Sequence, residues 1–201
     1  MKTIYIVIIG PDGCGKTSVA LGLQANLRLL GHDVRLHEFL FGAMPSISSL
    51  FKLKKNKKIN KSNFIGMVRP VSSFKAIVLS IWYGIDHLFG HYELFKKNKK
   101  IIIFARSYHD FLYQRVYKNL PIFFPKLFIA LGPKPDFIFS LVRKSSDIIK
   151  QKQELTEFEI NQQYLRIEKR MANYSNFKKI DCSIGLEKTI KLLSNIALKN
   201  I

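Results

Sequence analysis

Cysteine is scarce in this sequence: Cys14 and Cys182 are the only two among 201 residues. Two cysteines cannot form the disulfide framework of a small secreted protein, so we expect a reducing compartment, by default the cytoplasm. Long apolar runs are also missing. The longest uncharged run, residues 39–51, is interrupted by Gly42 and Pro45 and is shorter than the roughly 18 residues that a membrane-spanning helix needs. We therefore expect no transmembrane segment.

Acidic residues are few as well, with 14 Asp and Glu against 33 Lys and Arg, which gives a net charge of +19. Such an excess favours polyanionic partners such as nucleotides, nucleic acid or anionic lipid headgroups. Lysine dominates it, however, in the stretches 52–61 and 96–100. Stretches of this kind are also common on solvated surfaces of Asn-, Ile- and Lys-rich chains, so charge alone selects no function.

Apolar runs of strand length alternate with segments of helical periodicity along the chain. A length of 201 residues with 47% hydrophobic content suits one domain, residues 1–201. Strands are predicted at 3–9, 33–40, 101–105, 135–142 and 177–181, and helices at about 18–30, 74–95, 106–118, 156–174 and 185–200. The irregular basic segment 42–73 is expected to be mobile. The pattern predicts an α/β fold with a parallel sheet covered by helices, and ligands bound at the carboxyl ends of the strands.

The most specific motif is GPDGCGKT, residues 10–17, which directly follows a predicted strand and opens a predicted helix. Its spacing is that of a phosphate-binding loop: glycines let main-chain N–H groups surround a phosphate, the lysine reaches the β- and γ-phosphates, and the threonine hydroxyl faces Mg²⁺. The alternative is a glycine-rich turn that has this spacing by chance. The predicted nucleotide-binding residues are Gly10, Asp12, Gly13, Cys14, Gly15, Lys16, Thr17 and Ser18.

Cys14 lies at the start of that helix, where the pKa of a thiol tends to fall and oxidation becomes easier. A redox role is one interpretation. A tolerated loop residue is the other.

Several segments in fixed order carry a family resemblance: GPDGCGKTSVALGLQANLRLLGHDV, WYGIDHLFGHY, IIIFARSYHDFL and KPDFIFSLVRKSSDIIKQKQEL. Together they resemble thymidylate kinase-like nucleoside monophosphate kinases, in particular a branch associated with bacterial surface-polysaccharide genes. The resemblance covers nearly the whole chain. It implies a P-loop NTPase three-layer sandwich with a five-stranded parallel sheet in the order 2-3-1-4-5, and a lid at about 144–156. It also implies a homodimer through the long central helices.

The resemblance also implies roles for single residues. Lys16 and Thr17 would hold ATP and Mg²⁺, Asp12 would face the phosphoacceptor, and Arg106 matches the arginine of the family's Asp-Arg-Tyr segment. Basic lid residues would screen charge on the transferred phosphoryl group. The full expected set is Lys16, Arg106, Asp12 and Asp110 for catalysis, Thr17 for Mg²⁺, and Glu38, Asp86, Arg69 and Lys152 for the substrate. For the lid residues Lys150 and Lys152 a solvated helix face is the alternative, and for each carboxylate an ordinary surface or capping role is the alternative.

The sequence departs from the family at three positions, where Ala105, Val142 and Gln151 replace two acidic residues and a lid arginine. The first hypothesis is an ATP-dependent phosphotransferase acting on a nucleotide or another small phosphorylatable metabolite. The departures motivate a second, a catalytically weakened nucleotide-binding partner or switch subunit. A third is a binder of nucleic acid or an anionic membrane surface through residues 52–61 and 120–131.

Two histidines one helical turn apart, His87 and His91, make a conceivable pair of metal ligands. Two ligands are too few for a zinc site, so we expect an interfacial or substrate-facing role for them instead.

Overall fold

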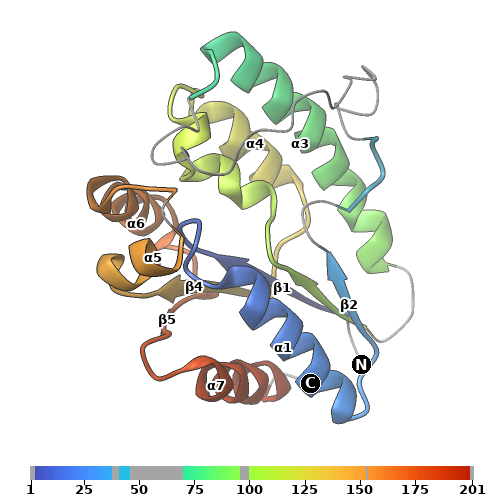
Figure 1. Ribbon diagram of the computed structural model, residues 1–201. Helices are drawn as coiled ribbons and strands as arrows, with labels where there is room; N and C mark the ends of the chain where they lie inside the picture. The colour runs from blue at the N-terminus through green and yellow to red at the C-terminus, as the bar shows by residue number, and fades with distance from the viewer. Residues whose placement is uncertain (1–2, 38–40, 46–69, 96–99, 153, 200–201) are drawn as a thin grey trace, which may run out of the picture.

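The computed structural model describes residues 3–37, 41–45, 70–95, 100–152 and 154–199. Within them the chain forms one five-stranded sheet in the order β2-β3-β1-β4-β5, with every neighbouring pair parallel (Figure 1). The strands are β1 (Ile4–Ile9), β2 (Val34–His37), β3 (Ile101–Phe104), β4 (Phe137–Val142) and β5 (Phe177–Asp181). All five strand predictions are therefore confirmed within the described residues, and so is the strand order implied by the resemblance.

Helices cover both faces of this sheet. The helices are α1 (Lys16–Leu29), α3 (Ser73–Phe95), α4 (Phe123–Leu131), α5 (Ser145–Gln151), α6 (Glu157–Met171) and α7 (Leu186–Leu198). Helices α1 and α7 pack on one face, and α3 and α4 lie on the other (Figure 1). The result is a three-layer α/β sandwich.

The central strand β1 explains why the sheet is so apolar. Its six residues are all buried, because alternate side chains enter different cores. Ile4, Ile6 and Ile8 pack with the core under α1 and α7, whereas the intervening residues pack with the core under α3 and α4. A strand covered on both faces must be apolar throughout, which is the pattern that the sequence shows.

Local signals fix several helix ends. Helix α1 ends at Leu29, and Gly31 follows with a φ of 85°, a conformation typical of a glycine helix stop. Helix α6 begins with a capping box, in which Thr156 and Glu159 each bind the other's main-chain N–H. This helix ends at Met171, three residues before the predicted end.

The segment 106–118 was predicted to be one helix, and the structure differs. It contains two short 3₁₀ segments, η2 (Tyr108–Leu112) and η3 (Arg115–Tyr117), separated by Gln114 with an extended ψ of 142°. The Asp110 carboxylate accepts from the side chains of Tyr113 and Gln114, which are local contacts. The Tyr113 hydroxyl also accepts from the Gly10 N–H, 103 residues away, so a long-range contact lies where the predicted helix is interrupted.

Two predictions lie mainly or entirely outside the described residues. Most of the basic segment expected to be mobile, including residues 52–61, is outside them, and so are the proposed substrate residues Glu38 and Arg69. Among the helices that the structure describes, none combines the length and apolarity needed to cross a membrane.

Helices α3 and α4 leave an apolar surface facing away from the sheet. Its side chains recur every three or four residues along α3, as on one face of a helix. We call this the α3–α4 face; its exposed members are Phe74, Val78, Ile81, Ile85, Phe89, Tyr92, Phe123, Leu127 and Leu131. An apolar row of this length is typical of a protein–protein interface.

The homodimer implied by the resemblance stays a prediction: if it forms through the α3–α4 face, the double variant Ile85→Glu/Phe89→Glu should be monomeric where the wild type is dimeric, because two charges would be buried unpaired at the interface. Light scattering coupled to size exclusion measures the mass. The control is Leu165→Glu, which changes an exposed leucine on α6, outside this face, and should leave the mass unchanged. A wild type that stays monomeric at about 100 μM would contradict the homodimer.

Candidate functional site

The loop between β1 and α1 has a backbone that only glycine adopts easily. Gly10, Gly13 and Gly15 have φ values of 149°, 89° and 101°. The space is tight too: a Cβ on Gly10 would lie 2.7 Å from the Cys14 sulfur, and one on Gly13 would lie 3.1 Å from an Ile148 methyl group of α5. The glycines therefore let the loop turn back on itself and let α5 pack directly against it.

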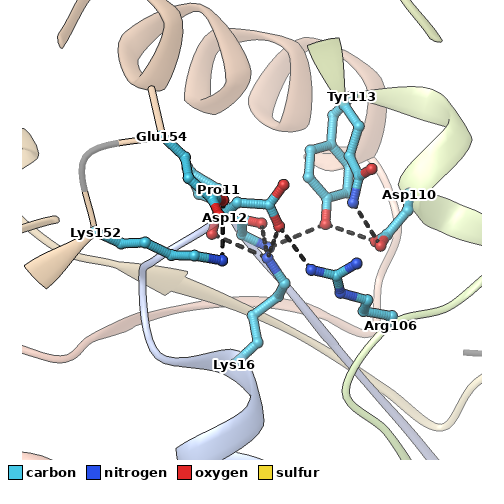
Figure 2. A network of polar contacts seen from close by, with 10 residues as sticks. Pro11, Asp12, Lys16, Arg106, Asp110, Tyr113, Lys152 and Glu154 are labelled. Carbon is cyan, nitrogen blue, oxygen red and sulfur yellow. Dashed lines mark hydrogen bonds and ion pairs between the residues drawn. The ribbon is translucent and has the colours of Figure 1, made fainter. Parts of the chain in front are cut away.

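Lys16, the first residue of α1, holds this loop together. Its ammonium group donates to the carbonyl oxygens of Gly10 at 2.6 Å and Pro11 at 2.9 Å, and to Oδ1 of Asp12 at 3.3 Å (Figure 2). Its side chain is only 5% exposed. Three acceptors therefore satisfy the three N–H donors of this buried ammonium group.

Main-chain donors at the start of α1 are open to a ligand. Within the described part of the chain, the N–H groups of Gly13, Gly15 and Thr17 have no acceptor, and Thr17 and Ser18 are exposed. The N-terminus of a helix carries partial positive charge, and its first N–H groups have no partner inside the helix. Together with Lys16, these groups form a site suited to an anion.

Asp12 and Arg106 meet beside the loop, as the sequence predicted for residues that follow neighbouring parallel strands. Oδ1 of Asp12 lies 3.3 Å from an Arg106 guanidinium nitrogen and 3.3 Å from the Lys16 ammonium. Asp12 follows β1 and Arg106 follows β3, so the sheet brings them together across 94 residues of sequence. Both side chains are partly exposed, and a ligand can therefore compete for either cation.

Asp110 is the most perturbed carboxyl group of the site. It is 1% exposed, and its two oxygens accept hydrogen bonds from the Tyr113 hydroxyl at 2.6 Å and the Gln114 amide at 2.8 Å. The Tyr113 hydroxyl also accepts from the Gly10 N–H at 3.3 Å. Burial raises the pKa of the Asp110 carboxyl to about 6, although the positive charge of Lys16 opposes this. Tyr113 and Asp110 lie beside each other next to Lys16 and Arg106 (Figure 2), and the bond to Gly10 links this pair to the first glycine of the loop.

Two cavities adjoin the loop. One, of about 480 Å³, is lined by Thr17, Leu21, Leu36, Ala105, Arg106, Asp110, Gln114 and Tyr117. The other, of about 340 Å³, is lined by residues of the loop, of α1, of the β4–α5 connection, of α5 and of the β5–α7 connection, including Gly15, Ser18, Arg143 and Lys144. We call them the β3-side cavity and the α5-side cavity. The consecutive residues Thr17 and Ser18 line different cavities, so the start of α1 separates the two.

The predicted lid region contributes contacts next to the loop. Lys152, directly after α5, pairs with Glu154 at 2.9 Å and is partly exposed. Gln151, where the family resemblance leads one to expect an arginine, accepts a hydrogen bond from Arg143 at 2.7 Å. Arg143 thus brings a guanidinium group to the α5-side cavity from the end of β4. Lys150 is exposed, in line with the solvated-face alternative.

Asp86, predicted to contact a substrate, has a structural contact instead. It is fully buried in α3, and its carboxylate accepts from the N–H groups of Gly42 at 3.3 Å and Met44 at 2.8 Å. It does not line the β3-side cavity. The observed role is to hold the segment that follows β2 against α3.

Cys14 does not have the environment that its position suggested. Its side chain is 1% exposed, and burial raises the pKa of the thiol, while Lys16 opposes this only in part. The expectation of a lowered pKa was wrong because burial of the thiol in the core under α1 outweighs the charge and the main-chain N–H of Lys16, which both lower the pKa. The structure therefore favours the interpretation of Cys14 as a tolerated loop residue.

His87 and His109 lie in the core of the molecule. Both are at most 1% exposed, their ring centroids are 6.0 Å apart, and burial lowers their pKa values to about 3 and about 4. They are therefore neutral at pH 7. His91 contacts the carbonyl oxygen of Leu131 at 2.9 Å. Burial of His87 excludes the interfacial role expected for it.

Sequence reasoning missed three site residues: Tyr113, Gln114 and Arg143. The first two lie three and four residues after Asp110, a spacing at which side chains on a helical turn meet. That spacing was a signal that could have been used. The contact between Tyr113 and Gly10 had none, because 103 residues separate them.

The raised pKa of Asp110 predicts a pH-dependent stability. An unfolded aspartate titrates near 3.8, so between about pH 4 and pH 6 the folded state binds more protons, and stability falls as pH rises through this window. We expect Asp110→Asn to raise the free energy of unfolding at pH 7.5 by about 1 to 3 kcal/mol, and this gain to vanish near pH 4.

Urea unfolding at both pH values measures this difference. Asp33→Asn, which changes a largely exposed carboxylate, is the control and should show no such difference. An Asp110→Asn variant that is destabilised equally at both pH values would show that the ionised carboxylate is not costly.

No protein-family model matches this sequence, and no curated protein matches it. The proposals below therefore depend on the geometry of the loop, its two cavities and the residues between them.

Proposed function

We propose that this chain is an ATP-dependent phosphotransferase that moves the γ-phosphate of ATP to a small acceptor. The observation that carries the proposal is the position of the glycine-rich loop between two cavities. A triphosphate bound at the start of α1 would have a nucleoside on one side and an acceptor on the other, as transfer between two small molecules requires. The same features support the P-loop NTPase class for the fold and a lid at about 144–156.

The charged side chains that line the two cavities indicate which cavity would hold the nucleoside end of ATP. Among its described side chains the α5-side cavity has Arg143 and Lys144 against one acid, Asp147, and it is continuous with the loop through Gly15 and Ser18. We assign it to the nucleoside and inner phosphates. The β3-side cavity, reached past Thr17, then receives the acceptor.

Lys16 and Arg106 would stabilise the charge that develops during transfer. Lys16 is held at the loop by two carbonyl oxygens and by Asp12, and a phosphate oxygen would replace one of these acceptors. Arg106 is half exposed at the mouth of the β3-side cavity, where it can reach the transferred group. Phosphoryl transfer depends mostly on such positioning and charge neutralisation.

The described residues fit Mg²⁺ in the manner usual for nucleotide sites. Among them no three His, Cys, Asp or Glu side chains gather as a metal cage. Mg²⁺ in such sites takes one or two protein ligands and fills the rest with phosphates and water. The exposed Thr17 hydroxyl would hold it, with Asp12 nearby to bind its water ligands. When bound, Mg²⁺ neutralises phosphate charge.

One observation favours the alternative of a weakened nucleotide-binding protein. Ala105 lines the β3-side cavity at the end of β3, where the family resemblance leads one to expect a carboxylate. If the absence of this carboxylate has abolished activity, Ala105→Asp should create transfer activity that the wild type lacks. Robust turnover by the wild type would exclude the alternative.

We expect Lys16→Ala to weaken ATP binding at least tenfold and to reduce transfer more than a hundredfold, because an ammonium group on the migrating phosphate is lost. Calorimetry measures ATP affinity, and ADP release measures transfer.

Lys75→Ala, at an exposed position of α3, is the matched control for loss of a positive charge. Thermal unfolding of both variants checks that the loop change has not unfolded the protein. Full ATP affinity in Lys16→Ala would refute the phosphate-binding role of the loop.

A further inference from the structure

The described wall of the β3-side cavity is poor in positive charge. Of its eight lining side chains, Arg106 is the only cation and Asp110 the only anion. Arg106 already faces Asp12 at 3.3 Å. Sites that bind a phosphate group usually direct several cations or main-chain N–H groups at it. Among the described residues, those groups lie at the loop and along the α5-side cavity.

A phosphate monoester would meet one cation, Arg106, among the described residues of this wall. It would bring nearly two negative charges beside the γ-phosphate and also beside Asp110, and charges of one sign repel strongly where water is scarce. A neutral acceptor avoids this repulsion. The neutral lining residues Leu21, Leu36 and Tyr117 also offer apolar surface for a ring. The cavity volume of about 480 Å³ suits a molecule of monosaccharide or nucleoside size.

Asp110 is held as a hydrogen-bond acceptor at this wall. Tyr113 and Gln114 each donate to one of its oxygens and fix the plane of the carboxylate. Each carboxylate oxygen can accept a second hydrogen bond, so the group can still receive a proton from a ligand in the cavity. Its pKa of about 6 leaves it ionised at neutral pH and suits a general base.

We infer that the acceptor is a neutral alcohol, of the kind that sugars and nucleosides present, and that Asp110 removes the proton of its hydroxyl group. This inference rests on the proposed function. In the reaction the hydroxyl oxygen forms a bond to the γ-phosphorus, and the bond from that phosphorus to the β,γ-bridging oxygen breaks. ADP leaves with the electron pair, and the proton passes to Asp110 and then to water.

Asp110 also explains how the site can function with Ala105. Both residues line the same cavity, so the carboxylate that the end of β3 lacks is provided from η2. It follows that Ala105→Asp should not increase transfer, since it would place a second buried carboxylate beside the first.

The test measures transfer from ATP to two matched panels: nucleosides and monosaccharides, and the corresponding nucleoside monophosphates and sugar phosphates. Phosphorus NMR distinguishes the products, because an alcohol gives a phosphomonoester and a phosphate gives a coupled pyrophosphate. We expect transfer to at least one alcohol, with a rate that rises with pH through about 6. Asp110→Asn should lower kcat at least a hundredfold and keep the Kd for ATP within about threefold. Asp33→Asn is the control.

The outcomes separate the two proposals. Transfer to phosphates only, no transfer to any alcohol while ATP binds, or full alcohol turnover by Asp110→Asn would each overturn this inference and leave nucleotide binding intact. Absence of ATP binding to the wild type would instead overturn the proposed function. An ATP affinity that falls in Asp110→Asn as much as kcat does would assign Asp110 to loop support through Tyr113 and would also overturn its role as base.

Discussion

The short connection between β1 and α1 is the constraint on which the rest of the site depends. It must reverse the chain direction within a few residues, expose main-chain N–H groups and keep a lysine at the helix start. The ammonium of Lys16 meets these demands by binding the carbonyl oxygens of Gly10 and Pro11, which otherwise would face the same space as an anion. Within the described part of the chain, the N–H groups of Gly13, Gly15 and Thr17 have no acceptor, so they remain available to a ligand.

The elements next to this loop pack closely against it. Helix α5 approaches so closely that a single Cβ on Gly13 would contact Ile148 and Lys152. On the other side, the Tyr113 hydroxyl reaches the Gly10 N–H and joins the loop to η2. The two cavities are therefore bounded by elements that each touch the loop, and a ligand in either cavity lies within reach of the same backbone.

Much of the fold could be predicted from the sequence, because it follows from local patterns. The continuous apolar run of residues 3–9 can only be a strand covered on both faces, and the capping box at Thr156 marks a helix start by its own side chains. The strand order could not be derived in this way, since it depends on which strands pair, and it entered only through the family resemblance. The helix predicted over 106–118 was wrong for a related reason: Tyr113 contacts Gly10, 103 residues away, and no local pattern reports that contact.

The candidate site was predictable to the extent that parallel strands end at one edge. That rule brings Asp12 and Arg106 together, as observed. The sequence could not tell which of Asp86 and Asp110 faces a ligand, because both lie in segments that were predicted to be helical. Both carboxylates are buried in the structure. Their partners differ. Asp86 accepts hydrogen bonds from main-chain N–H groups and holds two segments together, whereas Asp110 binds side chains and lines a cavity.

This difference in partners also bears on energetics. A buried carboxylate that accepts main-chain N–H groups is compensated by the backbone, and Asp86 has that arrangement. Asp110 remains costly when ionised, because burial outweighs the help from Lys16 and Tyr113. A neutral side chain of the same shape would stabilise the protein more at this position. The ionised Asp110 carboxylate lowers the stability of the fold. It lies on a cavity wall and is joined through Tyr113 to the loop, so the chemistry of a bound ligand best explains why a carboxylate occupies this position.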